Sequence, residues 1–147
     1  MSQSHKRHRG QPGPDREQFL GQLVQEYHAT EDNEAKQQVL ANLGNFAYDS
    51  INHGWLWNVN AIDVFLDAIE QEDPLLKEFG SGGLANICLD SRHHQYLVSN
   101  QKHIQSITVL INQQQNITAD TVINSMTILM LLINESSKQG KLFFSDM

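Results

Sequence analysis

The sequence predicts an all-α fold, a short right-handed solenoid in which about three helical repeats stack side by side. Apolar residues recur with the period of an α-helix from residue 16 onward. One stretch of this pattern occurs twice, at residues 43–49 and again at residues 84–90. With only 3 prolines in 147 residues, the composition also favours helices over a β-sandwich.

Residues 1–15 lack any apolar period and contain glycine, proline and the basic stretch HKRHR at 5–9. We expect them to form a disordered basic tail. Such a tail could contact RNA phosphates or direct nuclear import, and it could equally be a solvated end of the chain. The repeat domain is expected to follow, over residues 16–147.

The first helix of this domain has one apolar face that begins at Phe19 and ends at Tyr27. Another amphipathic helix covers residues 61–69, where Asp63 and Asp67 lie on the opposite face and are expected to be plain surface. Short segments near 52–58 and 92–99 separate the longer helices and are too brief to be stable alone.

End signals define the later helices. Asp73 followed by Pro74 predicts an N-cap and a first helical residue, which opens a helix over about residues 74–90. Either Thr118 or Asp120 could open a last helix that runs toward Asn134.

The internal repeat decides the fold class. LGNFAYD at 43–49 recurs as LANICLD at 84–90, and a looser third copy follows as LMLL at 129–132. A short, a medium and a long helix in each unit, at this spacing, are typical of armadillo and HEAT repeats. Three glycines, Gly80, Gly82 and Gly83, then lie inside a long helix, which predicts that a neighbouring helix approaches closely there.

The negative charge of the repeat domain argues against nucleic-acid binding by that domain. From residue 17 onward, 6 Lys and Arg face 16 Asp and Glu, a formal charge of -10 that would repel phosphates. The single cysteine, Cys88, cannot form an internal disulfide and fits a reducing compartment. No apolar run approaches the length of a membrane span, so we expect no membrane contact.

The stretch VLANLGNFAYD at 39–49, the helix AIDVFLDAI at 61–69 and GGLANICLD at 82–90 resemble the armadillo repeat-containing protein 7 family. The likeness extends over about residues 18–134, with a specific match in the first repeat and a loose one in the third. It implies a non-enzymatic subunit of the minor spliceosome, located in the nucleus and active in pre-mRNA splicing. The implied partner is an RNA-recognition-motif protein similar to RNA-binding motif protein 48, within a spliceosomal ribonucleoprotein.

The resemblance also implies a concave groove lined by the third helix of each repeat. In armadillo arrays an asparagine there can bind the backbone of an extended peptide, and Asn45 and Asn86 occupy that position. Carboxylates along the edge would bind Arg or Lys. The candidate partner-binding residues in the groove are Asn45, Asp49, Asn86, Asp90, Leu131 and Glu135.

Two alternatives stay open for these residues. The asparagines could instead buttress neighbouring helices, and the acids could simply end their helices in water. Peptide-carrying importins pair each such asparagine with a tryptophan one turn earlier, where this chain has Ala41 and Gly82. An import-type carrier is therefore a weaker alternative than a generic peptide-binding adaptor.

Trp55 and Trp57 flank Leu56 in a polar segment. Two tryptophans two positions apart cannot both face the core of one short helix, so we expect one in the core and the other as an exposed anchor. Trp55 completes the set of candidate partner-binding residues.

The sequence gives little support for an enzymatic function. Gly80-Ser81-Gly82-Gly83 has no preceding strand and no lysine at the position that a phosphate-binding loop requires. Cys88 with His93 and His94 fits neither a zinc spacing nor a cysteine-protease pattern. We expect no catalysis, no metal and no cofactor.

Overall fold

The computed structural model describes residues 13–138, with side chains from residue 15 to residue 134. Throughout that range the ordered elements are helical. They are α2 (Gly13–Ala29), α3 (Asn33–Tyr48), η1 (Ser50–Asn52), α4 (His53–Asn58), α5 (Ala61–Ile69), α6 (Pro74–Ile87), α7 (Ser91–Val98), α8 (Gln101–Asn112) and α9 (Ala119–Lys138). Helix α2 begins inside the segment expected to be a tail, and residues 1–12 lie outside the described residues.

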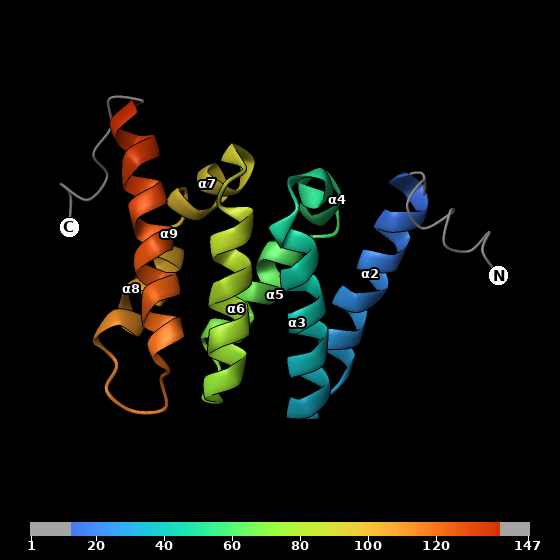
Figure 1. Cartoon of the computed structure of the whole chain (residues 1–147), viewed down its shortest axis with the longest axis horizontal. Helices are drawn as coiled ribbons and strands as arrows, with labels where there is room; N and C mark the ends of the chain where they lie inside the picture. Colours follow the sequence, from blue (N-terminus) through green and yellow to red (C-terminus); the bar gives the residue numbers. More distant parts are fainter. Residues whose placement is uncertain (1–12, 139–147) are drawn as a thin grey trace.

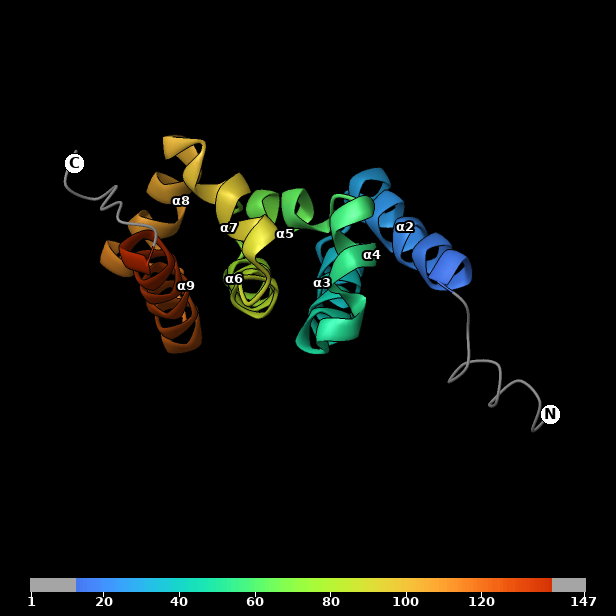
Figure 2. The ribbon, with the colours of Figure 1, turned by 90° about the horizontal axis from the view of Figure 1, so that it is seen from above.

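The helices form two layers. Figures 1 and 2 show α3, α6 and α9 side by side in one layer, with α2, α5 and α8 behind them. The short helices α4 and α7 lie at the same end of the molecule (Figure 1). Units of short, medium and long helices, α4–α6 and α7–α9, follow the pair α2–α3. The structure thus confirms the predicted armadillo-like helical solenoid.

Local capping explains where the long helices start. Oδ2 of Asp73 accepts a hydrogen bond from the Leu76 amide at 3.1 Å, and Pro74 is the first helical residue, as predicted. At the start of α9, Oγ1 of Thr118 accepts from the Thr121 amide at 3.2 Å. Thr118, rather than Asp120, therefore caps the last helix.

The turn from each long helix into the next short one uses a repeated pattern, Asp-Ser-x-x-His. In the first copy, Oδ1 of Asp49 accepts from the Ile51 amide at 3.2 Å, and Nε2 of His53 donates to the Ala47 carbonyl at 2.7 Å. In the second copy, Asp90 accepts from the Arg92 amide at 2.9 Å.

The histidine of the second copy repeats the same contact. His94 Nε2 lies against the Cys88 carbonyl, which corresponds to Ala47 in the first copy. We call these two turns the Asp-His corners. Each ties the last carbonyls of a long helix, which would otherwise lack partners, to the following short helix.

The core lies between the two layers and centres on α5, where Phe65 is fully buried. A Cβ atom at Gly83 would lie 2.6 Å from Cδ1 of Phe65, and one at Gly80 would lie 2.8 Å from Cβ of Ala68. These two glycines therefore confirm the predicted close helix approach. Gly82 differs, because a Cβ there would meet only Nδ2 of Asn124, at 3.5 Å.

Acidic residues on one face of α5 and at its end accept hydrogen bonds from α2, α7 and α8. The hydroxyl of Tyr27 on α2 donates to Asp67 at 2.8 Å, and the hydroxyl of Tyr96 on α7 donates to Asp63 at 2.6 Å. Ser106 on α8 donates to Glu70 at 2.7 Å. Asp63 is exposed, as expected, whereas Asp67 is half-buried, and both accept hydrogen bonds from other helices, which the sequence did not predict.

Candidate protein-binding groove

A groove with a volume of about 300 Å³ runs between α3, α6 and α9. Its α3 wall includes Ala41 and Asn45, and its α6 wall includes Gly82 and Asn86, so the structure brings these four predicted groove positions together. The full lining is Leu40, Ala41, Gly44, Asn45, Glu78, Phe79, Gly82, Gly83, Asn86, Asp120 and Asn124.

The two predicted asparagines have different roles. Nδ2 of Asn86 donates to the carbonyl oxygen of Gly44 at 3.1 Å, which ties α6 to α3. A carboxamide has two N–H donors and an acceptor oxygen, so this bond leaves Asn86 further capacity toward the groove. The Asn45 side chain is exposed and has no hydrogen-bond partner among the described residues. Asn45 is thus the amide most available to a ligand.

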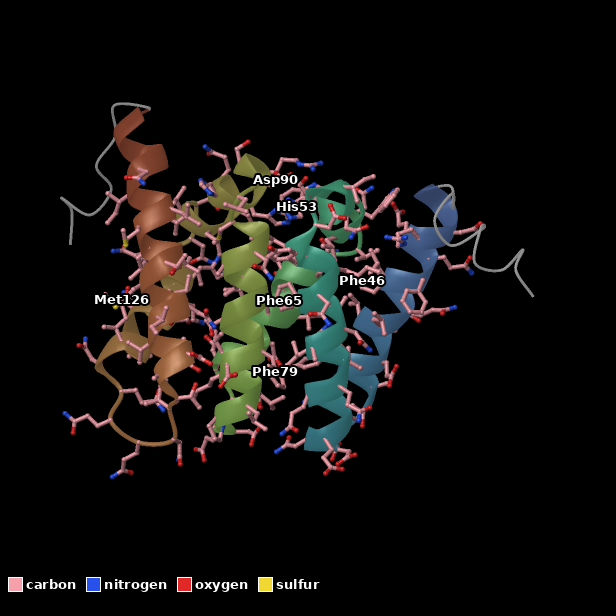
Figure 3. All side chains as sticks on the ribbon, in the orientation of Figure 1. Phe46, His53, Phe65, Phe79, Asp90 and Met126 are labelled. Carbon is pink, nitrogen blue, oxygen red and sulfur yellow. The ribbon has the colours of Figure 1, made fainter. Side chains whose placement is uncertain are left out.

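Several lining residues, among them Glu78, Phe79, Asp120 and Asn124, were not predicted as groove residues from the sequence. Nδ2 of Asn124 on α9 donates to Oγ of Ser81 at 3.2 Å and to the Glu78 carbonyl at 3.4 Å, which ties α9 to α6. Phe79 is half-buried against the core and gives the groove an aromatic surface; Figure 3 labels it on α6. Its position three and four residues before Gly82 and Gly83 is a helical-face signal that could have revealed it.

The formal charges in the groove lining are both negative. They belong to Glu78 and Asp120, and the lining contains no lysine or arginine. Neither carboxylate has a hydrogen-bond or ion-pair partner among the described side chains. A guanidinium or ammonium group entering the groove would therefore find carboxylates that are not already neutralised.

Asp49 and Asp90, the acids predicted at the edge of the groove, both belong to the Asp-His corners. Asp49 is exposed and caps η1. Asp90 caps α7 and forms an ion pair with Arg92 at 2.9 Å. The hydrogen bond from the Arg92 side chain lowers the pKa of Asp90 to about 2. Because Arg92 already neutralises it, Asp90 offers a partner's cation less attraction than Glu78 or Asp120 does.

The buried residues of α9 align the third repeat with the first two one residue earlier than the LMLL match at 129–132 predicts. The matching buried residues of the three long helices are Leu43, Leu84 and Ile128. The position of Asn45 and Asn86 then falls to Met130, which is exposed, and not to Leu131. Residues 128–133 are all apolar, so their identities alone could not fix the register.

Leu131 is half-buried and packs against the core. Glu135 belongs to α9, but its side chain lies outside the described residues. The roles predicted for these two residues in partner binding stay predictions.

The expected division between the two tryptophans is wrong, because both are half-buried. Leu56 between them is fully buried and takes the core position. The Arg16 guanidinium lies 5.6 Å from the Trp55 ring centre and 5.3 Å from that of Phe46, so Trp55 helps anchor α2. The Trp57 ring packs edge-on against His93, with ring centres 5.3 Å apart.

The cysteine and histidines near the second corner are buried. Burial raises the pKa of the Cys88 thiol to about 12 and lowers the pKa of His93 to about 4. A thiol and an imidazole with these shifts both stay neutral at physiological pH. His94 contacts the backbone carbonyl of Cys88 through Nε2.

Residues 13–138 contain neither a metal-binding cluster nor a membrane-spanning helix. No group of three or more His, Cys, Asp or Glu side chains there is arranged to hold a metal ion. No helix in that part of the chain has both the length and the apolar character needed to cross a membrane.

Comparison with known proteins supports the repeat assignment. Armadillo repeat-containing protein 7 of Mus musculus is 47% identical to this chain over 66 residues. That region makes up 45% of this chain and 33% of the mouse protein, so the chain matches only a third of its relative's length. No protein-family model matches the chain. The similarity and the helical architecture together support an armadillo-type repeat protein.

Proposed function

We propose that this chain is a non-enzymatic scaffold that binds a protein partner along the groove between α3, α6 and α9. The observation that carries the proposal is the groove itself, which combines the available amide of Asn45 with the unpaired carboxylates of Glu78 and Asp120. An amide can bind both the N–H and the C=O of an extended backbone. Unpaired carboxylates favour a cationic side chain on the same segment.

The partner we propose is an RNA-recognition-motif protein similar to RNA-binding motif protein 48, in the minor spliceosome of the nucleus. This proposal draws on the resemblance to armadillo repeat-containing protein 7, with which the chain is 47% identical over part of its length. The acidic body is compatible with a division of labour in which the partner binds the RNA and this chain braces the partner.

A purified RNA-recognition-motif partner tests the proposal directly, by isothermal titration calorimetry with the full chain. We expect a 1:1 complex that Asn45→Ala weakens and that Glu78→Lys with Asp120→Lys weakens by at least tenfold. Charge reversal at Asp49 and Asp90 is less informative, because both residues cap helices and the substitutions would disturb the fold. Gln105→Ala, at an exposed position on α8, is the matched control.

A pulldown from nuclear extract, with mass spectrometry and small-RNA sequencing, tests the cellular assignment. Minor-spliceosome proteins should be recovered with the wild-type chain and depleted with the Glu78→Lys, Asp120→Lys variant. Recovery of importins or of unrelated cytosolic peptides in their place would contradict the spliceosomal assignment while leaving the scaffold role intact.

A further inference from the structure

Gly82 is a helical glycine for which the packing of the chain gives no reason. Gly80 and Gly83 make room for α5, whereas a Cβ atom at Gly82 would have Nδ2 of Asn124 as its nearest neighbour from another helix, at 3.5 Å. That distance is an ordinary van der Waals contact, so alanine would fit at position 82. Glycine is less favourable than alanine in the interior of a helix, and a glycine that the fold does not need indicates a role in binding.

Gly82 lies in the middle of the face that α6 presents to the groove. Glu78 and Phe79, one turn before it, and Asn86, one turn after it, line the groove with it. Helix α6 itself forms the central wall, between α3 and α9 (Figures 1 and 2). Because glycine has no side chain, a ligand can approach the helix backbone here, between the carboxylate of Glu78 and the amide of Asn86.

We infer that Gly82 is a specificity-determining residue of the groove, and that it admits one arginine side chain of the protein partner between α6 and α9. This inference rests on the proposed scaffold function and names the residue that the partner presents. The arginine stem crosses α6 at Gly82 and contacts the Phe79 ring. Its guanidinium lies between the carboxylates of Glu78 and Asp120.

The arrangement of the lining favours arginine over lysine. The two carboxylates come from different helices, Glu78 from α6 and Asp120 from α9. A planar guanidinium has five N–H donors in a fixed fork and can bind two carboxylates at once, whereas the ammonium of lysine is a compact point charge. A guanidinium also packs on aromatic rings. The chain contains such a pair, because the Arg16 guanidinium lies 5.3 Å from the centre of the Phe46 ring.

The volume of the groove and the charge of its lining fit this occupant. A volume of about 300 Å³ lies at the low end of the roughly 300–1,000 Å³ typical of ligand sites, which suits one long side chain with its flanking backbone. The lining contains no lysine or arginine that would neutralise Glu78 and Asp120. A second copy of the chain, with a formal net charge of -7, would bring like charge to them. A partner protein is therefore favoured over a second copy.

The glycine amides allow a direct test by nuclear magnetic resonance. The chain has 9 glycines, so labelling of glycine alone with ¹⁵N gives a simple spectrum. Gly82→Ala and Gly44→Ala each remove one signal and thereby assign it, and both glycines line the groove. The probes are three short, end-capped peptides of serine and glycine with one central arginine, lysine or glutamine.

We expect the arginine peptide to shift the signals of Gly82 and Gly44 in a saturable way, and to leave that of Gly54 on α4 in place. The lysine peptide should bind several-fold more weakly, and the glutamine peptide should give no saturable shift. These differences are expected because only arginine can bind both carboxylates and pack on Phe79 together.

Variants at position 82 test the role of the glycine, with binding followed at the Gly44 signal. Gly82→Leu keeps a good helix former but fills the opening, so it should weaken binding of the arginine peptide about tenfold, which is equivalent to about 1.4 kcal/mol. Gly82→Ala should weaken it less. Gly21→Ala is the matched control on α2, where a Cβ atom would lie 3.6 Å from Val59, and should leave binding unchanged.

Thermal melting separates a loss of binding from a loss of fold. Gly82→Ala should melt at or above the wild-type temperature, and a lower melting temperature would overturn the inference, because the fold itself would then need the glycine. Equal binding of the arginine peptide to wild type and Gly82→Leu would overturn it as well. So would equal binding of the arginine and lysine peptides, or the absence of a shift with all three.

A dimer that forms without peptide and that Gly82→Leu disrupts would also overturn the inference, in favour of a second copy. The proposed function can fail separately. If the RNA-recognition-motif protein does not bind but the peptides behave as expected, the role of Gly82 stands and the spliceosomal proposal falls. If that protein binds, and Glu78→Lys with Asp120→Lys weakens it while Gly82→Leu does not, the scaffold role stands and the role of Gly82 falls.

Discussion

Gly83 sets the distance between α5 and α6 by the methyl group that it lacks. The Phe65 ring fills the space that a Cβ atom would need, and the ring itself is fully buried. In a helix, glycine is less favourable than alanine by about 1 kcal/mol, so the chain accepts a local penalty in return for aromatic packing. Gly82, the next residue toward the N-terminus, faces the groove and has no such constraint.

Substitution of these neighbouring glycines should therefore have opposite effects. Gly83→Ala should lower the free energy of unfolding by about 1–3 kcal/mol, because Phe65 must move out of a packed core. Gly82→Ala should leave it unchanged or raise it by up to about 1 kcal/mol, through helix propensity. Urea denaturation of both variants measures the difference, and equal effects would show that α5 and α6 are not in tight contact there.

His93 carries the largest acid sensitivity that we expect from the second corner. Burial lowers its pKa from an ordinary 6.5 to about 4, against the favourable charge of Asp90 and together with the unfavourable charges of His53 and Arg92. Between those two pH values the unfolded chain binds a proton that the folded chain does not. Folding stability should therefore fall as the pH drops from about 6.5 to about 4, and be unaffected by His93 above that window.

Replacing His93 with asparagine, the residue at the same position of the first corner, tests this effect. Asn52 occupies the position of His93 and donates to the Phe46 carbonyl at 2.9 Å. The His93→Asn variant should lose less stability than the wild type between pH 7.5 and pH 5, by roughly 1–2 kcal/mol. Urea midpoints at the two pH values measure the difference. Parallel pH dependences for both proteins would contradict a neutral, buried His93.

At the scale of elements, the Asp-His corners explain how short helices such as α4 are held in place. A helix of this length is marginal by itself, so its stability must come from its neighbours. His53 and Asp90, at the same end of the molecule in Figure 3, come from the two corners. Each corner is local in sequence, since His53 contacts a carbonyl only six residues before it.

Removal of one corner bond should destabilise the fold measurably. His53→Ala leaves the buried carbonyl of Ala47 without its partner, which should cost about 1–3 kcal/mol. His28→Ala, at an exposed position on α2, is the control and should change stability by less than about 0.5 kcal/mol. Thermal melting of both variants by circular dichroism measures the effect. Equal melting temperatures would mean that water replaces the imidazole at this carbonyl.

Helix order and the groove walls could be predicted from the sequence because their signals are local. Asp73 and Pro74 mark a helix start by themselves, and the repeated Leu-x-Asn pattern aligns Asn45 with Asn86. The repeat-based part of the site, Ala41, Asn45, Gly82 and Asn86, was predictable for the same reason.

The remaining site residues, the partners of α5 and the register of α9 depend on contacts between helices. A single sequence does not encode such contacts in simple patterns. The hydrogen bonds that Asp63 and Asp67 accept come from tyrosines on other helices, and the amphipathic pattern of α5 alone does not reveal such partners. Asn124 has no counterpart in the earlier repeats that would have drawn attention to it. The uniformly apolar run at 128–133 could fit several registers, and only burial distinguished Met130 from Leu131.

At the scale of the whole molecule, the negative net charge favours binding to protein over binding to RNA. The charge of -10 over residues 17–147 leaves few cations to displace counterions from a phosphate backbone. We expect that part of the chain to bind RNA weakly and without sequence preference at physiological salt. Fluorescence anisotropy with labelled RNA measures this, and tight, sequence-selective binding would contradict the proposed division of labour.

The exposed apolar residues of α9 (Ile123, Met126, Met130 and Ile133) bear on the stability of the whole array. Armadillo-like repeats stabilise one another through their neighbours, and about three of them are near the minimum for a solenoid. We expect the isolated chain to melt at a low temperature or to self-associate. A partner present at a hundred times its dissociation constant should add about 2.7 kcal/mol. Differential scanning fluorimetry with and without partner measures this, and an unchanged melting temperature would contradict it.

The loop between α8 and α9 has a different character from the Asp-His corners. A side-chain hydrogen bond within this loop runs from Nε2 of Gln113 to the Gln115 carbonyl at 2.6 Å, and Asn116 adopts a left-handed conformation with φ of 57°. Since the corners hold each long helix to the next short one, extra residues in this loop need not disturb the stacking. The loop is thus the natural point for inserting a fluorescent label or an affinity peptide, at the end of the molecule opposite α4 and α7 (Figure 1).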